Sequence, residues 1–111
     1  MTTLTGGHFQ NFLAQPLANG YLLLQLSHDA QATGSVQVVA GPNIRVPLDA
    51  NGSVSGVINV WANGDLTPTT TFYFVQVFAA DGTVQSSPQL LKLTIPSGAT
   101  YNLDNWIPLS P

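Results

Sequence analysis

Residues that could take part in catalysis are few and scattered along this chain. It has two histidines, His8 and His28, five aspartates, and no glutamate or cysteine. A nucleophilic site needs a hydroxyl or thiol beside a base, and His28-Asp29 would be half of a catalytic triad. No serine stands in a Gly-x-Ser-x-Gly motif, and Ser53 lies in turn-like sequence. The sequence therefore predicts a protein that is not an enzyme and has no catalytic residues.

One short segment resembles a metal-binding loop. In the run 49–53, Asp49-Ala50-Asn51-Gly52-Ser53, oxygen-bearing side chains recur at alternate positions, as they do in a calcium loop. The bidentate glutamate that completes such a loop has no counterpart here. An Asx turn leading into a hairpin explains the same residues. No metal site and no cofactor are predicted.

Flat aromatic side chains offer a second kind of chemistry, which is stacking on sugar rings. Trp61 ends an apolar stretch just before Asn63-Gly64, where it could stack on a glycan or cap the core. Tyr21 follows Asn19-Gly20 and is the second candidate for glycan stacking. A glycan-binding adhesin module, from a phage or a cell surface, is therefore kept as an alternative function.

The composition excludes several classes of protein. Charged residues make up 6% of the 111 residues, against roughly 25% in an average soluble domain. Two basic residues are too few to neutralise phosphates, so neither nucleic acid nor an anionic membrane is an expected partner. No apolar run approaches the ~20 residues of a membrane span, and the first residues have no signal-peptide pattern. A weakly charged polar surface gives little protection against self-association, which favours a homo-oligomer.

The apolar pattern predicts an all-β fold. Asn-Gly or Asp-Gly pairs predict type I′ hairpin turns at 19–20, 51–52, 63–64 and 81–82. Between and around them, apolar residues alternate over 21–26, 36–38, 44–48, 58–60, 71–78 and 91–95. No helical apolar stripe extends over ten residues. Short strands at this spacing predict a single antiparallel β-sandwich over residues 9–95.

Strand 71–78 is apolar on both of its faces. If Tyr73, Val75 and Val77 face the core, then Phe72, Phe74 and Phe78 face outward. Burial of one phenylalanine contributes about 1.5–3 kcal/mol, so three of them facing solvent indicate a surface that something covers. The cover is the chain's own arm, a neighbouring subunit or a ligand.

The two ends of the chain are predicted to be arms. Residues 1–8 form an N-terminal arm, and residues 96–111 form an extended C-terminal arm whose prolines exclude a central strand. The C-terminal segment is nevertheless too apolar for a disordered tail. It docks either on its own sandwich or, as an exchanged arm, on a neighbour. The residues expected to make that contact are Tyr101, Leu103, Trp106 and Ile107.

The order of several short motifs resembles a module common in tailed-bacteriophage and prophage proteins. These motifs are Gln15-Pro16-Leu17-Ala18-Asn19-Gly20-Tyr21, Leu48-Asp49-Ala50-Asn51-Gly52-Ser53, Val60-Trp61 with Leu66-Thr67-Pro68, and the aromatic strand that ends in Asp81-Gly82. The resemblance covers about residues 9 to 95. Where the module continues with a Trp-Gly-Pro type of strand, this chain has Ser86-Ser87-Pro88.

The resemblance implies an immunoglobulin-like or fibronectin-type-III-like sandwich that decorates virions. The expected function is that of a non-enzymatic structural protein, a multi-copy capsid decoration or cement protein or a neck or tail accessory protein. Its expected partners are other capsid or tail subunits and further copies of itself, with a trimer as one arrangement. The protein would be made in the bacterial cytoplasm and end in the virion. Phe72, Phe74 and Phe78, with the C-terminal arm, would form the contacts.

Overall fold

A computed structural model describes residues 1–10, 13–27, 30–32, 38–39, 44–67, 70–84 and 91–106. Ten strands and two single 3-10 turns occur in these ranges: β1 (Thr2–Thr5), β2 (Tyr21–Leu26), β3 (Ala30–Ala32), β4 (Val38–Val39), β5 (Ile44–Pro47), β6 (Ile58–Val60), η1 (Asn63–Asp65), β7 (Leu66–Thr67), β8 (Tyr73–Phe78), β9 (Leu91–Leu93), β10 (Thr100–Asn102) and η2 (Leu103–Asn105). The all-β expectation is confirmed. His28, Asp29 and Ile107, which the sequence singled out, lie outside the described residues.

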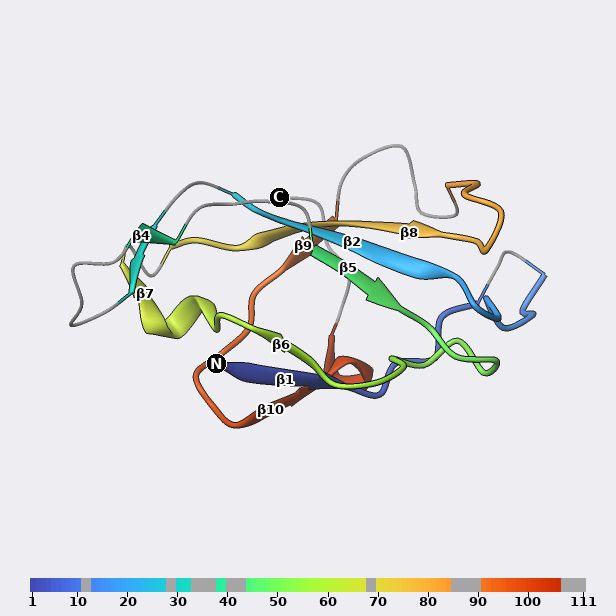
Figure 1. The fold of residues 1–111 in the computed structure, drawn as a ribbon, viewed down its shortest axis with the longest axis horizontal. Coiled ribbons are helices and arrows are strands. Elements are labelled where there is room, and N and C mark those ends of the chain that lie inside the picture. Colours follow the sequence, from blue (N-terminus) through green and yellow to red (C-terminus); the bar gives the residue numbers. More distant parts are fainter. Residues whose placement is uncertain are drawn as a thin grey trace.

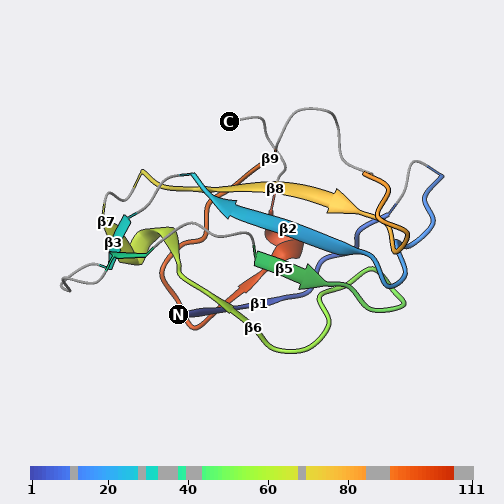
Figure 2. The same ribbon diagram turned by 45° about the horizontal axis from the view of Figure 1, so that its top comes forward.

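The strands form three sheets, ordered β10-β1-β6, β5-β2-β8-β9 and β4-β3-β7. Figure 1 shows the first sheet lying along one side of the second, with the small third sheet at one end. In Figure 2 the four strands of the second sheet are seen side by side. Leu4 and Val60 of the first sheet join Leu22, Leu24 and Val75 of the second in one buried cluster. The two large sheets therefore enclose a common core.

The alternating pattern of the sequence sets which residues of β2 and β8 face this core. Leu22 pairs with Val77 and Leu24 with Val75 across the antiparallel ladder. All four are at most 7% exposed, and so is Tyr73 at the start of β8. The inward set predicted for strand 71–78 is confirmed, and the phenylalanines consequently fall on the other face of the sheet.

The turns lie where they were predicted, but the predicted type I′ geometry is wrong. That geometry needs a positive φ at both residues of the pair. In the pairs 51–52 and 81–82 only the glycine has a positive φ (76° at Gly52 and 88° at Gly82). In the pair 19–20 only Asn19 has a positive φ (59°). The Gly82 N–H donates to the Ala79 carbonyl, and the Ala79 N–H donates to the Thr83 carbonyl. These two bonds are the pattern of a three-residue hairpin loop. The Asn63-Gly64 pair forms the 3-10 turn η1 instead.

Both chain ends are parts of the first sheet. β1 lies in the middle of this sheet, antiparallel to β6 and parallel to β10, although the sequence predicted only antiparallel pairs and assigned 1–8 and 96–111 to arms. Leu4 of β1 and Leu103 after β10 are 1% and 4% exposed. As far as Trp106, the last described residue, the C-terminal segment packs on its own chain. This is one of the two arrangements that the sequence left open.

Two buried polar side chains join the segments around η1. The amide of fully buried Asn63 donates to Thr71 Oγ1 (3.1 Å) and accepts the N–H of Ile95 (2.8 Å). The hydroxyl of Tyr73 donates to the carbonyl of Trp61 (2.6 Å). Burial raises the pKa of the Tyr73 phenol to about 12, because the phenolate would lose its water.

We expect Asn63→Ala to destabilise the chain by about 2 kcal/mol or more, because the Ile95 N–H and Thr71 hydroxyl would stay buried without their partner. Urea unfolding at neutral pH measures the change. The control is Asn51→Ala at an exposed turn position, which should cost less than about 1 kcal/mol. Equal losses in the two variants would contradict a structural role for the Asn63 amide.

Tyr73 makes the stability depend on alkaline pH. Its pKa is raised in the folded state, so its contribution is complete below pH 10 and is lost as the pH rises toward about 12. Tyr73→Phe should be less stable by about 1 kcal/mol at pH 7, where the bond to Trp61 is lost. It should also lose less stability than the wild type between pH 10 and 12. Urea unfolding over this pH range tests both effects, and parallel alkaline curves would refute the second.

Candidate functional site

The outward side of the sheet β5-β2-β8-β9 gathers large apolar side chains. Two-residue alternation places these residues opposite the core-facing set, and none of them packs against the core cluster. We call this surface the outer aromatic face; its residues are Tyr21, Leu23, Arg45, Phe72, Phe74, Phe78 and Lys92. The five apolar members are partly exposed.

The rings on this face pack in pairs. Phe72 and Phe74 meet edge to face with centroids 5.0 Å apart, and Tyr21 stacks on Phe78 at 4.9 Å. Such pairs contribute about 0.5–1.5 kcal/mol beyond their buried area. The contacts explain why the phenylalanines are only partly exposed, although they lie on the side of the sheet away from the core.

Both basic residues of the chain lie on the same face. The Arg45 guanidinium is 4.1 Å from the centre of the Tyr21 ring, and the Lys92 ammonium is 4.9 Å from that of Phe72. A cation that lies over the face of an aromatic ring is attracted electrostatically by the ring, which stabilises the pair. The face is therefore apolar and positively charged on a chain whose net charge is −3.

Of the four contact residues predicted in the C-terminal segment, three lie away from this face. The fourth, Ile107, is outside the described residues. Leu103 belongs to the core, so this side chain is not available to a partner in the observed arrangement. Tyr101 and Trp106 are partly buried and pack against the core, and burial raises the pKa of Tyr101 above 10. The structure thus places the three outward phenylalanines on one face, Phe72 with Phe74 and Phe78 with Tyr21, and does not bring the residues of the C-terminal segment to them.

The two glycan-stacking candidates lie on different sheets. Trp61 follows β6 and packs against the core. Tyr21 is flanked by Phe78 from β8 and by Arg45 from β5, which pair with opposite edges of β2. Its ring faces are therefore already in contact with other side chains. The structure does not combine Trp61 and Tyr21 into one site.

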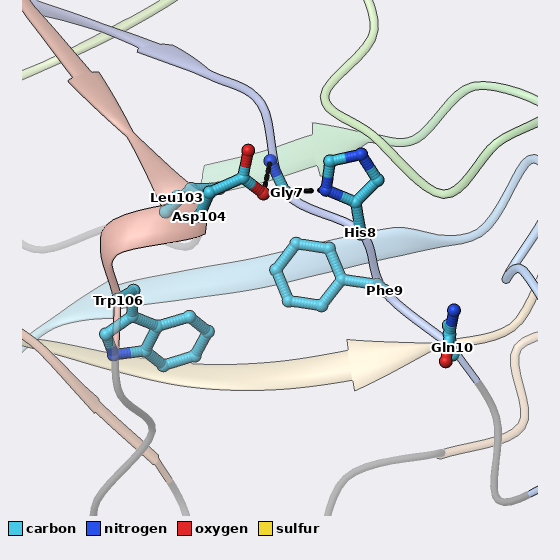
Figure 3. A pocket seen from close by; sticks show the side chains of 7 residues that line it. All are labelled: Gly7, His8, Phe9, Gln10, Leu103, Asp104 and Trp106. Carbon is cyan, nitrogen blue, oxygen red and sulfur yellow. Dashed lines mark hydrogen bonds and ion pairs between the residues drawn. The ribbon is translucent and has the colours of Figure 1, made fainter. Parts of the chain in front are cut away.

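A pocket of about 310 Å³ lies where the two chain ends meet, and sequence reasoning missed it. We call it the terminal pocket. Figure 3 shows Phe9 between Trp106 and His8, with Asp104 beside His8. Trp106 and Asp104 come from the end of η2 and His8 from the segment after β1, so the pocket exists only because these segments are adjacent.

Hydrogen bonds fix the polar side of the terminal pocket. Asp104 Oδ1 accepts the N–H of Gly7 (3.1 Å) and lies 2.7 Å from Nδ1 of His8. Because a carboxylate has no proton to give, Nδ1 is the donor. The Asp104 N–H is held in turn by the side chain of Asn102, which caps η2. The His8 side chain is 71% exposed, and it is paired with Asp104.

The run 49–53 forms the Asx turn that was predicted as an alternative to a calcium loop. Asp49 Oδ1 accepts the N–H groups of Asn51 (2.8 Å) and Ser53 (3.1 Å). Asp81 Oδ1 accepts the Thr83 N–H in the same way, and hydrogen bonds with the Thr83 side chain and the Thr83 backbone lower the pKa of Asp81. Among the described residues, no three histidine or acidic side chains gather into a possible metal site.

No family model, curated protein or solved structure matches this chain. Within the described ranges, the chain has no helix long and apolar enough to cross a membrane. The function of this chain is consequently inferred from the outer aromatic face and the terminal pocket.

The glycines before His8 let the two chain ends approach each other. Gly6 has φ 69°, and a Cβ at this position would overlap the Asn102 side chain. We expect Gly6→Ala to destabilise the chain by about 2 kcal/mol or more, because the clash adds to the cost of a positive φ.

The matched control is Gly56→Ala, which has φ 78° but no atom within 4 Å of the added methyl group. It should cost about 1 kcal/mol, from the backbone conformation alone. Thermal unfolding of the two variants measures the difference. An equal loss in both would mean that the close approach to Asn102 is not a constraint.

Proposed function

We propose that this chain is a non-enzymatic structural protein of a bacteriophage particle, a multi-copy capsid decoration or cement protein or a neck or tail accessory protein. The outer aromatic face is the observation that carries the proposal. Large apolar side chains clustered on one accessible surface are typical of protein–protein contact sites. In this proposal the protein is made in the bacterial cytoplasm and acts in the virion.

An immunoglobulin-like or fibronectin-type-III-like fold is part of this proposal. The motifs over residues 9 to 95 support it, and so does the position of Tyr73. In such folds a tyrosine at the start of a late core strand donates its hydroxyl to upstream backbone. Tyr73 begins β8 and donates to the carbonyl of Trp61.

The proposed contact is between this face and a neighbouring subunit, which is either another copy or a different capsid or tail protein. Phe74 has the central place, since it packs on Phe72 and pairs across the ladders with Gln25 and Lys92. Two cations on this face favour a partner surface that offers carboxylates around an apolar centre. Burial of such rings between subunits would resist their separation without any covalent bond.

Self-association through this face is tested by Phe74→Asp. We expect the wild-type chain, of 11.7 kDa, to form an oligomer of defined mass, and the variant to associate at least about tenfold more weakly. Light scattering over a range of concentrations measures the mass. Since Phe74 does not contact the core, circular dichroism should show an unchanged fold.

Val57→Asp is the control for the added charge, because Val57 is apolar and 78% exposed but does not lie on the outer aromatic face. Its mass should equal that of the wild type. A wild-type chain that stays monomeric at high concentration, or a Phe74→Asp oligomer as stable as the wild type, would contradict self-association through this face. Removal of residues 96–111 is a poorer test, since it also removes β10 and the buried Leu103.

A further inference from the structure

The terminal pocket presents two hydrogen-bond acceptors that no described residue of the chain uses. Asp104 Oδ1 is occupied by the Gly7 N–H and by His8 Nδ1, whereas Oδ2 has no partner among the described residues. With its proton on Nδ1, the neutral His8 ring has an acceptor at Nε2. The Asp104 side chain is 41% exposed and that of His8 71%, so both acceptors are accessible. A ligand of this pocket must therefore bring donors.

Aromatic rings form the apolar wall of the pocket. Trp106 is held by the bond from its Nε1 to the carbonyl of Lys92 (2.9 Å). Its indole lies against Phe9, with ring centroids 6.2 Å apart and planes tilted by 49°. Figure 3 shows both rings beside the His8–Asp104 pair. A ligand here meets a flat apolar surface next to two acceptors.

We propose that the terminal pocket binds a neutral hexopyranose. One side of a pyranose ring presents C–H groups that pack on an indole, while its neighbouring hydroxyls donate to acceptors such as Asp104 Oδ2 and His8 Nε2. The volume of about 310 Å³ is at the small end of ligand pockets and suits a single ring. A tetraalkylammonium cation would satisfy the carboxylate and the rings, but it has no hydroxyl for the imidazole nitrogen.

The pocket is held in shape before a ligand arrives. Gly7 has φ 85°, and a Cβ there would lie 2.7 Å from the Phe9 ring. Asp104 is fixed by the bond of its N–H to the Asn102 side chain and by the Gly7 N–H that donates to its carboxylate. Trp106 is fixed by the bond of its Nε1 to the Lys92 carbonyl. Ligand binding would therefore cost little conformational entropy of the protein. None of the residues that line the pocket belongs to the outer aromatic face, so the proposal can be tested independently of the proposed virion contact.

The experiment uses fluorescence from Trp106 alone. The chain has two tryptophans, so Trp61→Phe leaves Trp106 as the only one. We expect one or more of the methyl glycosides of glucose, galactose, mannose and N-acetylglucosamine to change its emission saturably. For so small a ligand, a Kd of about 1 mM is expected. Tetramethylammonium chloride, which has no hydroxyl, serves as the cationic probe.

Variants in this background assign the binding to the pocket. Asp104→Ala should raise the Kd about tenfold or more, because it removes an acceptor and releases His8. Asp81→Ala is the matched control: it removes the same charge and a similar bond to backbone, from the turn after β8, and should leave the Kd unchanged. His8→Ala, at a largely exposed position, should weaken binding even if Asp104→Ala fails to fold.

Three results would overturn the proposal. The first is no saturable change with any of the glycosides. The second is a Kd that neither His8→Ala nor Asp104→Ala alters. The third is saturable binding of tetramethylammonium chloride that depends on Asp104, with no binding of the sugars.

Discussion

The constraint on which this molecule depends is that β8 is apolar on both faces while its sheet has a core on only one. Burial of Tyr73, Val75 and Val77 against Leu22 and the other core residues fixes the orientation of the strand. The phenylalanines of the other parity then necessarily lie on the outer side. A shift of one residue would reverse both sets, so the core and the outer aromatic face are specified together.

The second layer of the core comes from the two ends of the chain. β1 lies between β6 and β10, so that residues near position 3 and near position 100 are neighbours. This arrangement places Leu4 and Leu103 over the inward side of the larger sheet. It also creates the terminal pocket, because His8 and Asp104 each follow one of the two paired strands. The same contact that completes the core thus forms the site proposed for a sugar.

The sequence predicted one of the two surfaces and missed the other for a clear reason. Phe74 and Phe78 belong to β8 and Phe72 directly precedes it, so alternation along this one segment is enough to place all three on the same face. His8 and Asp104 are 96 residues apart, and each is unremarkable in its local sequence. The segment containing Trp106 was expected to dock somewhere, but no local pattern indicated that it would lie against Phe9. For Trp61 and Tyr21, aromatic character alone suggested a role that their packing does not combine into one site.

What the sequence by itself determined was local: the all-β class, the positions of the turns, and the inward and outward sides of β2 and β8. These follow from steric preferences and two-residue alternation, which act between near neighbours. Only the tertiary structure decided that the supposed arms are strands, that β1 and β10 are parallel, and that Asn63-Gly64 is a 3-10 turn rather than a hairpin. In each case the decisive contact, such as that of Asn63 with Thr71 and Ile95, joins separate segments. Its free energy appears only when the core brings these segments together, so no single segment specifies it.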